Sequence, residues 1–105
     1  MRETLYRASR VCRILGNPVV FAIVVELLEQ GGMTPSELSK RLRRSVQTVS
    51  THLARLRTAD LVRYEADGRR THYHLKHPKE IRHLLTTLRG LVAATLHVPD
   101  STACG

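Results

Sequence analysis

The sequence predicts a mainly α-helical domain that carries one β-hairpin, and three observations lead to this fold class. Apolar residues recur at helical spacing near the start of the chain and again from Glu80 to Leu96. Two short helical patterns separated by a turn follow Thr34, which has the features of a helix start. Alternating residues then flank Asp67-Gly68, a dipeptide typical of hairpin turns. Helix, turn, helix and hairpin in this order indicate a winged helix-turn-helix, a module that commonly reads duplex DNA.

The first two predicted helices are separated by a glycine. The first runs from Thr4 to Leu15, and four of its residues form one stripe: Leu5, Ala8, Cys12 and Leu15. Gly16 ends it, and Asn17-Pro18 starts the second helix, because Asn is a good N-cap and Pro suits the first helical position. The second helix continues to about Gln30, is apolar on nearly every side, and stops at Gly31-Gly32. Such an apolar helix is expected at the centre of the fold.

The third and fourth helices form the predicted helix-turn-helix. Thr34-Pro35-Ser36-Glu37 is a capping box, in which the threonine and glutamate side chains bond each other's backbone N–H groups. Arg43-Arg44 forms the turn, and Ser45 caps the fourth helix. Apolar residues in that helix repeat at helical spacing and are expected to face inward: Val46, Val49, Leu53 and Leu56. Asp60 is expected to end the helix in a left-handed conformation, which Asp tolerates better than most residues.

Two short strands and a long helix complete the predicted domain. The strands are Leu61 to Glu65 and Thr71 to Leu75, and His77-Pro78 ends the alternating pattern. The last helix, Glu80 to about Leu96, has its apolar residues on one broad side: Ile81, Leu84, Leu85, Leu88, Leu91, Val92 and Leu96. We therefore predict one DNA-binding and dimerisation domain over residues 1–98 and a flexible tail over 99–105.

The charge of the chain favours a phosphate-rich partner. The 105 residues carry a formal net charge of +8. From Lys40 to His72 there are nine Lys/Arg and three Asp/Glu, a local excess of six positive charges over the predicted reading segment. A solvated basic face is the alternative interpretation. No apolar run approaches the roughly 20 residues of a membrane span, and no secretion signal is evident. Two cysteines make no disulfide framework. We therefore expect a cytoplasmic protein without a membrane partner.

The fourth helix and the hairpin supply the candidate DNA-binding residues. Short polar side chains near a helix N-terminus let the backbone approach base edges in the major groove. Basic residues at a hairpin tip can follow the phosphate backbone or enter the minor groove. The predicted DNA-binding residues are Arg44, Ser45, Gln47, Thr48, Ser50, Thr51, Arg55, Arg69 and Arg70. The alternative is an ordinary polar surface, which the basic hairpin that follows the helix argues against.

Several motifs carry a family resemblance: Leu15-Gly16-Asn17-Pro18, Ser36-Glu37-Leu38, Ser45 through Leu53, Leu61-Val62, Gly68-Arg69-Arg70 and Tyr73-His74-Leu75. Together they resemble the arsenic-repressor (ArsR/SmtB) family of winged-helix transcriptional regulators, over roughly residues 5–96. Ser45 through Leu53 is similar to that family's Ser-Gln-Pro-Thr-Val-Ser-x-His-Leu recognition helix. The chain departs from the family at Val46-Gln47, where Gln-Pro is common, and at Asp60, where Gly is common. The first departure can change which base is read.

The resemblance implies a homodimer built from the first and last helices, in agreement with their amphipathic stripes. It also implies a repressor that binds an imperfect palindrome in a promoter and is released by an effector. The family's arsenic site needs a Cys-x-Cys pair at the start of the third helix, which is absent from Thr34 to Arg41. The family's zinc site on the last helix is absent or incomplete, because His83 and His97 lack carboxylates at matching spacing.

Cysteine and histidine side chains are the candidates for sensing an effector. Cys12 and Cys104, with His97, are candidates for binding a soft metal or metalloid ion or for forming a disulfide, and the chain could equally lack any cofactor. The alternative is that Cys12 packs on an apolar stripe while Cys104 lies in the tail. His72, His74 and His77 are close in sequence, but we favour solvated or phosphate-contacting histidines over a metal site.

Three other classes of protein compete with a sequence-specific repressor. A small, non-specific, basic nucleic-acid-binding protein would share the charge but show little sequence preference. A winged helix used only for protein contacts would tolerate charge reversal of Arg69 and Arg70. An enzyme is not expected, because the sequence has no glycine-rich phosphate loop, no nucleophile elbow and no paired carboxylates. We expect double-stranded DNA and a second copy of the chain as partners, and no small-molecule substrate.

Overall fold

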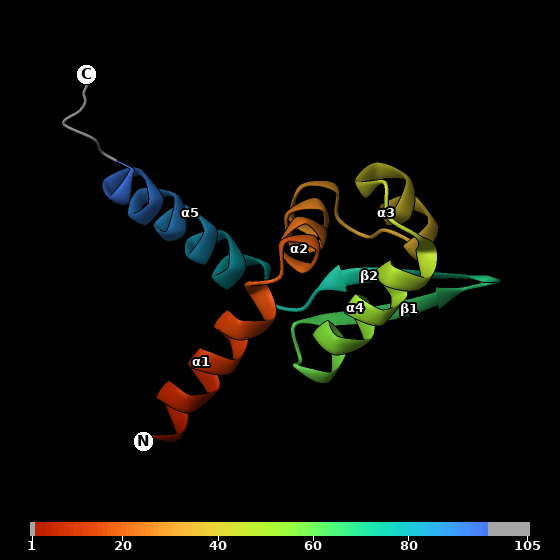
Figure 1. Cartoon of the computed structure of the whole chain (residues 1–105). Helices are drawn as coiled ribbons and strands as arrows, with labels where there is room; N and C mark the ends of the chain where they lie inside the picture. Colours follow the sequence, from red (N-terminus) through yellow and green to blue (C-terminus); the bar gives the residue numbers. More distant parts are fainter. Residues whose placement is uncertain (1, 97–105) are drawn as a thin grey trace.

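The computed structural model describes residues 2–96, and within them five helices and one two-stranded sheet follow in the predicted order (Figure 1). The elements are α1 (Glu3–Leu15), α2 (Pro18–Gln30), α3 (Pro35–Leu42), α4 (Val46–Thr58), β1 (Val62–Asp67), β2 (Arg70–Leu75) and α5 (Pro78–Thr95). Figure 1 shows α1 and α5 projecting from the side of the molecule opposite the hairpin tip. The predicted mainly helical winged helix-turn-helix is confirmed.

Helix boundaries are fixed by the side-chain caps that the sequence predicts. The Asn17 carboxamide oxygen accepts the Val19 and Val20 N–H groups at 2.9 and 3.3 Å. Thr34 and Glu37 form the capping box, with bonds of 2.9 and 3.1 Å to each other's backbone N–H groups. These bonds satisfy N–H groups that a helix start otherwise leaves without partners. The caps therefore set where α2 and α3 begin.

Residues with positive φ end three of the elements. Gly31 after α2 has φ 79°, and Asp60 after α4 has φ 65°, as predicted. Arg43 after α3 has φ 56°, a conformation that the sequence did not reveal, because Arg has no particular tendency to adopt it. The Arg44 N–H donates to the Ser39 carbonyl, and Ser39 Oγ donates to the Arg44 carbonyl. These bonds hold the turn between α3 and α4.

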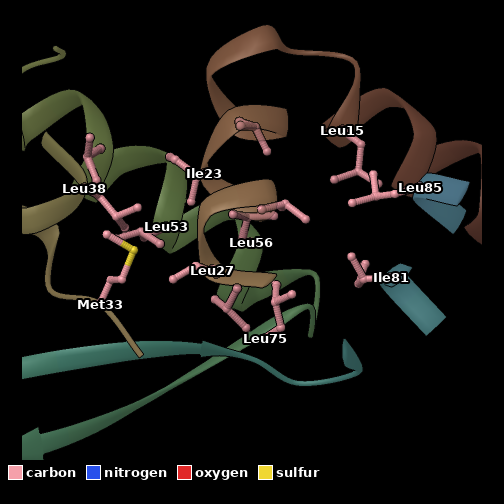
Figure 2. Packing of buried hydrophobic residues seen from close by; sticks show 14 residues of the cluster. Leu15, Ile23, Leu27, Met33, Leu38, Leu53, Leu56, Leu75, Ile81 and Leu85 are labelled. Carbon is pink, nitrogen blue, oxygen red and sulfur yellow. The ribbon is translucent and has the colours of Figure 1, made fainter. Parts of the chain in front are cut away.

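The hydrophobic core is built around α2, as its apolar sequence predicted. Val20, Ile23, Val24 and Leu27 of α2 are buried with at most 2% of their surface exposed. In Figure 2, Leu38 of α3 and Leu53 of α4 lie toward one end of this core, and Leu15, Ile81 and Leu85 lie toward the other. Full burial of each such side chain contributes about 1.5–3 kcal/mol. This packing fixes α4 against α2 and α3.

The hairpin is longer than predicted. β1 extends to Asp67 and β2 begins at Arg70, with Asp67 paired to Arg70 and Val62 paired to Leu75. The turn therefore consists of Gly68 and Arg69, and Gly68 adopts φ 63°. Met33 and Tyr73 exchange backbone hydrogen bonds of 3.1 and 2.8 Å, which attach β2 to the segment before α3. The hairpin is thus anchored at its base while its tip projects beyond the core (Figure 1).

Val46 contradicts the prediction that it faces the core. It is 45% exposed, whereas Val49, Leu53 and Leu56 of the same helix are fully buried. Helical spacing gives the direction of a side chain but not whether a neighbouring element reaches that level of the helix. Val46 is the first residue of α4, and it lies beyond the end of the core. Its exposure places an apolar side chain on the candidate DNA-binding surface.

The terminal helices leave much of their apolar surface exposed. In α1 only Leu15 is buried, while Leu5 is 60% exposed and Cys12 is also exposed. In α5 only Ile81 and Leu85 are buried, and Leu96 is 70% exposed. No single helix within residues 2–96 is long and apolar enough to cross a membrane, although α1 and α2, bent by 94°, together pass on length and composition. His97, Cys104 and the predicted tail lie outside the described residues.

Candidate nucleic-acid interface

The N-terminus of α4 is capped by Ser45, whose hydroxyl is already engaged within the helix. Its oxygen accepts the Thr48 N–H at 3.0 Å, and its proton is donated to Thr48 Oγ1 at 2.9 Å. Thr48 is half-buried. Ser45 and Thr48, both predicted to contact DNA, therefore stabilise the start of the helix in the free protein.

The outward face of α4 brings together three of the predicted residues. Gln47, Ser50 and Thr51 are exposed, and the side chain of Ala54 is exposed one turn further along. Thr51 Oγ1 donates to the Gln47 carbonyl at 2.9 Å, which fixes its rotamer and leaves its methyl group and lone pairs free. Arg55 is exposed on the same helix, and Arg44 is exposed in the turn before it. The side chains of this face are short and polar, and the face is accessible to a DNA groove.

A groove of about 370 Å³ separates the N-terminal half of α4 from the hairpin. Its lining comes from α3 with the residue before it, from α4 and from the β1–β2 hairpin, which we call the wing. The lining residues are Thr34, Pro35, Ser36, Glu37, Lys40, Val46, Ser50, Arg69, Arg70 and Thr71. The two wing arginines thus face the same space as Ser50 of α4, the predicted recognition helix. The sequence-based set missed Ser36, Lys40 and Val46, because their position depends on how α3 and the wing pack beside α4.

The wing arginines are available for an external anion. Arg69 and Arg70 are exposed, and neither takes part in an ion pair within residues 2–96. Glu37 at the edge of the groove has a lowered pKa, first because its carboxylate accepts the Thr34 N–H, with smaller contributions that include Arg70. Although Glu37 is ionised, Lys40, Arg69 and Arg70 outnumber this one carboxylate in the groove lining, so the groove keeps a net positive charge.

Contacts along the hairpin hold the wing in a defined orientation relative to α4. The Arg57 guanidinium of α4 lies 4.9 Å from the Tyr64 ring centroid, and that ring lies 5.9 Å from the Tyr73 ring. Such cation–π and aromatic contacts contribute about 0.5–1.5 kcal/mol each. Arg63 Nη1 donates to Glu65 Oε1 at 2.7 Å, and Arg63 is the first cause of the lowered pKa of Glu65. The wing and the recognition helix are therefore coupled.

Two of the histidines after the turn have identifiable places in the fold. His74 Nε2 lies 3.3 Å from Glu65 Oε1, and its ring packs so closely on Gly32 that a Cβ there would lie 2.4 Å away. His77 is the residue before α5. Over residues 2–96, no cluster of three or more His, Cys, Asp or Glu side chains is arranged to hold a metal ion. His74 is thus a packing residue at the base of the wing.

Cys12 is the predicted effector residue that the structure describes. It is exposed on α1 and lines an apolar cavity of about 490 Å³ with Leu15, Gly16, Pro18, Phe21, Leu84 and Leu88. A second cavity of about 460 Å³ continues along α5 and shares Phe21 and Leu88 with the first. The thiol therefore lies on the apolar surface between α1, α2 and α5, far along the chain from the recognition helix.

The surroundings of His52 are expected to make the stability of the domain depend on pH. It is half-buried, and within the described residues its buried Nδ1 atom has no hydrogen-bond partner. Burial, and to a smaller extent the nearby Arg55, lowers the pKa of His52 below 6.5. The folded state disfavours the protonated imidazole. The contribution of neutral His52 to the free energy of unfolding is therefore fully present above pH 6.5, and it is lost as the pH falls from there through the pKa of the folded state.

We expect His52→Gln to flatten the fall in stability on acidification. Urea unfolding at pH values of about 7.5 and 5.5 would measure it, since these values lie on either side of an ordinary histidine pKa. His83→Gln is the matched control, because His83 is exposed on α5. A His52→Gln protein that loses as much stability between the two pH values as the parent would contradict this role.

Comparison with known proteins agrees with this geometry. A family model described as a helix-turn-helix domain matches residues 15–65, which include α2, α3, α4 and part of β1. No curated protein matches the chain. HlyU from Vibrio cholerae N16961 is 29% identical with a TM-score of 0.73, over 84% of this chain and 97% of that one. The transcriptional regulator HlyU from Vibrio vulnificus CMCP6 is 26% identical with a TM-score of 0.69, over 82% and 91%.

A third solved structure shares the fold over most of the chain. It is the homodimeric winged helix-turn-helix DNA-binding domain of Mb0332 from Mycobacterium bovis, a possible ArsR-family transcriptional regulator. The identity is 23% and the TM-score 0.70, over 96% of this chain and 91% of that one. The matched helix-turn-helix and these structures confirm the winged helix-turn-helix that the motifs indicated. The chain therefore has the winged helix-turn-helix fold of DNA-binding transcriptional regulators and is similar to the HlyU proteins.

Proposed function

We propose that the protein is a dimeric, sequence-specific repressor that binds a palindromic operator through the major groove. The observation that carries this proposal is the juxtaposition of the exposed polar face of α4 with the wing arginines across one groove. A helix of this polarity fits the major groove, and two cations beside it suit the flanking phosphates. Non-specific binding would need the charge but not the capped, outward-facing helix.

The individual residues suit different parts of the duplex. Gln47 can pair with adenine, and Thr51 can present its methyl group or lone pairs to a base edge. Arg55, Arg69 and Arg70 suit phosphates, and so does Arg44 in the turn. Ser45 and Thr48 support the same surface by ordering the first turn of α4, which brings its remaining N–H groups toward a phosphate. Loss of either hydroxyl should therefore weaken binding.

Dimerisation is proposed through α1 and α5. Their exposed apolar residues include Leu5, Leu91, Val92 and Leu96, and the two apolar cavities beside α5 border this surface. A contiguous apolar surface of this kind is rarely left in water by a monomeric domain. The Mycobacterium bovis domain of the same fold is homodimeric. Two recognition helices related by a two-fold axis would then read the two halves of a palindrome.

Release of the operator by a metal, a metalloid or a thiol oxidant is a further part of the proposal. Cys12 is an exposed thiol on the proposed dimer surface, where a bound ion or a disulfide could change how the protomers pack. His97 and Cys104 remain candidate partners for it. A response that survives in both Cys12→Ser and Cys104→Ser proteins would contradict a cysteine-based sensor.

The first test is fluorescence anisotropy of the reduced protein with DNA from upstream of its own gene. We expect binding about a thousandfold tighter than to a scrambled duplex of the same length, as for specific regulators. Adding zinc, cadmium, arsenite or an oxidant to the complex would then identify the signal. Equal affinity for the two duplexes would instead favour a non-specific basic nucleic-acid-binding protein.

A further inference from the structure

Val46 is an apolar side chain that the fold does not use. It is 45% exposed at the first position of α4 and takes no part in the hydrophobic core. Residues at helix starts are usually polar or negatively charged, because they lie beside unpaired N–H groups. Valine is also a weaker helix former than alanine. Neither packing within the protomer nor helix formation therefore explains a valine at this position.

The surroundings of Val46 point to the bases of bound DNA. Val46 lines the groove with Ser50, one turn further along α4, and with Arg69 and Arg70 of the wing. The neighbouring residue Gln47 is exposed at the same end of the helix. In helix-turn-helix proteins, the N-terminal residues of the recognition helix contact base edges. Val46 is thus at the level of the helix from which bases are read.

The chemistry of the major groove limits what an apolar side chain can recognise there. Guanine, cytosine and adenine present hydrogen-bonding groups, which a valine cannot satisfy. Thymine presents a C5-methyl group beside its carbonyl oxygen, and apolar side chains make favourable contacts with that methyl group. A β-branched side chain in a helix has one strongly preferred rotamer, so its two methyl groups are held in a fixed direction.

We propose that Val46 is a specificity-determining residue that selects thymine at one position of each operator half-site through its C5-methyl group. This inference rests on the proposed sequence-specific function and names one determinant of the sequence. The exposed methyl groups leave water on binding, and the thymine methyl leaves water with them. A base without that methyl group lacks the contact, and its polar edge loses water without gaining a hydrogen bond.

The test uses a duplex selected by the native protein from a random DNA library. Each thymine of the selected duplex is replaced in turn by deoxyuridine, which removes the C5-methyl group and leaves base pairing unchanged. For the native protein, we expect one position in each half-site at which the replacement raises Kd about fourfold, the effect of one buried methyl group. For Val46→Ala, the Kd for the thymine duplex should rise and the deoxyuridine effect at that position should disappear.

Two further variants make the result specific to Val46. Val46→Thr keeps one methyl group and should retain part of the discrimination. Ser50→Ala removes a predicted DNA contact in the same groove, so its Kd for both duplexes is expected to rise, but the ratio of its Kd values for the deoxyuridine and thymine duplexes should equal that of the native protein. A duplex with 5-methylcytosine at the sensitive position tests whether the methyl group alone suffices, and partial recovery relative to cytosine is expected.

The outcomes separate this inference from the proposed function. If the library yields one sequence and Val46→Ala keeps the native deoxyuridine effect at every position, the assignment of Val46 is wrong while sequence-specific binding stands. If the library yields no preferred sequence, the proposed function itself fails, and the inference fails with it. Because Val46 is exposed and outside the core, circular dichroism should show native folding in both Val46 variants.

Discussion

Replacing Arg69 and Arg70 with alanine is expected to lower operator affinity by about three orders of magnitude at physiological salt. Each lost phosphate contact reduces the magnitude of the slope of log K against log salt by about 0.9. The proposed dimer has two wings and would lose four contacts, so the magnitude of the slope falls by about 3.6. At a salt concentration of about 0.15 M this change corresponds to roughly a thousandfold in affinity. Both arginines are exposed and unpaired within residues 2–96, so the fold should tolerate their removal.

The measurement is anisotropy of the operator complex over a range of salt concentrations. Lys79→Ala with Arg82→Ala is the matched control, because it removes the same charge from exposed positions on α5. The control should change the salt slope little, since α5 projects from the side away from the wing tip (Figure 1). A wing variant whose slope equals that of the control would mean that Arg69 and Arg70 do not contact phosphates.

Much of the fold could be predicted because the responsible interactions are local. Asn17, Thr34 and Ser45 each cap a helix that begins one residue later, and the bonds join residues two or three apart. Asp60 adopts the left-handed conformation that was expected from its position after α4. Such bonds depend on sequence spacing and little on the rest of the chain, so a single sequence reveals them.

The candidate interface was predicted less completely because it depends on distant segments. The apolar spacing of α4 correctly places Val49 and Leu53 in the core, but it cannot show that α4 extends past the core at Val46. Lys40 joins the groove only because α3 packs beside the wing. Arg43 takes a left-handed conformation that its side chain does not signal. These features follow from tertiary packing, which overrides local preference.

The difference between local pattern and tertiary packing also separates the two halves of α5. Its apolar stripe was predicted as one continuous face, yet Ile81 and Leu85 are buried within the protomer while Leu91 and Leu96 are exposed. An apolar stripe indicates that another protein surface covers it. It does not show whether that surface belongs to the same chain or to a second one. The free protomer leaves the second half uncovered, and that half is where a second copy is proposed to bind.

Replacing Val92 with glutamate is therefore expected to convert the proposed dimer to a monomer and to abolish tight operator binding. Val92 is 50% exposed and lines the apolar cavity along α5. Two such glutamates would lose water in the interface and carry like charges, a combination that costs several kcal/mol. We expect the dimer Kd to rise by about a thousandfold or more, and a monomer can occupy only one half-site.

Sedimentation equilibrium distinguishes the two states, because the protomer has a mass of 11.9 kDa. Thr86→Glu is the matched control, since Thr86 is exposed and lies away from the apolar side of α5. Val92 lies outside the buried core, so thermal unfolding should remain cooperative in the variant, and a loss of binding can be attributed to assembly. If Val92→Glu sediments as a dimer with native operator affinity, the second half of α5 is not the dimer surface, and its apolar residues must bind a different partner.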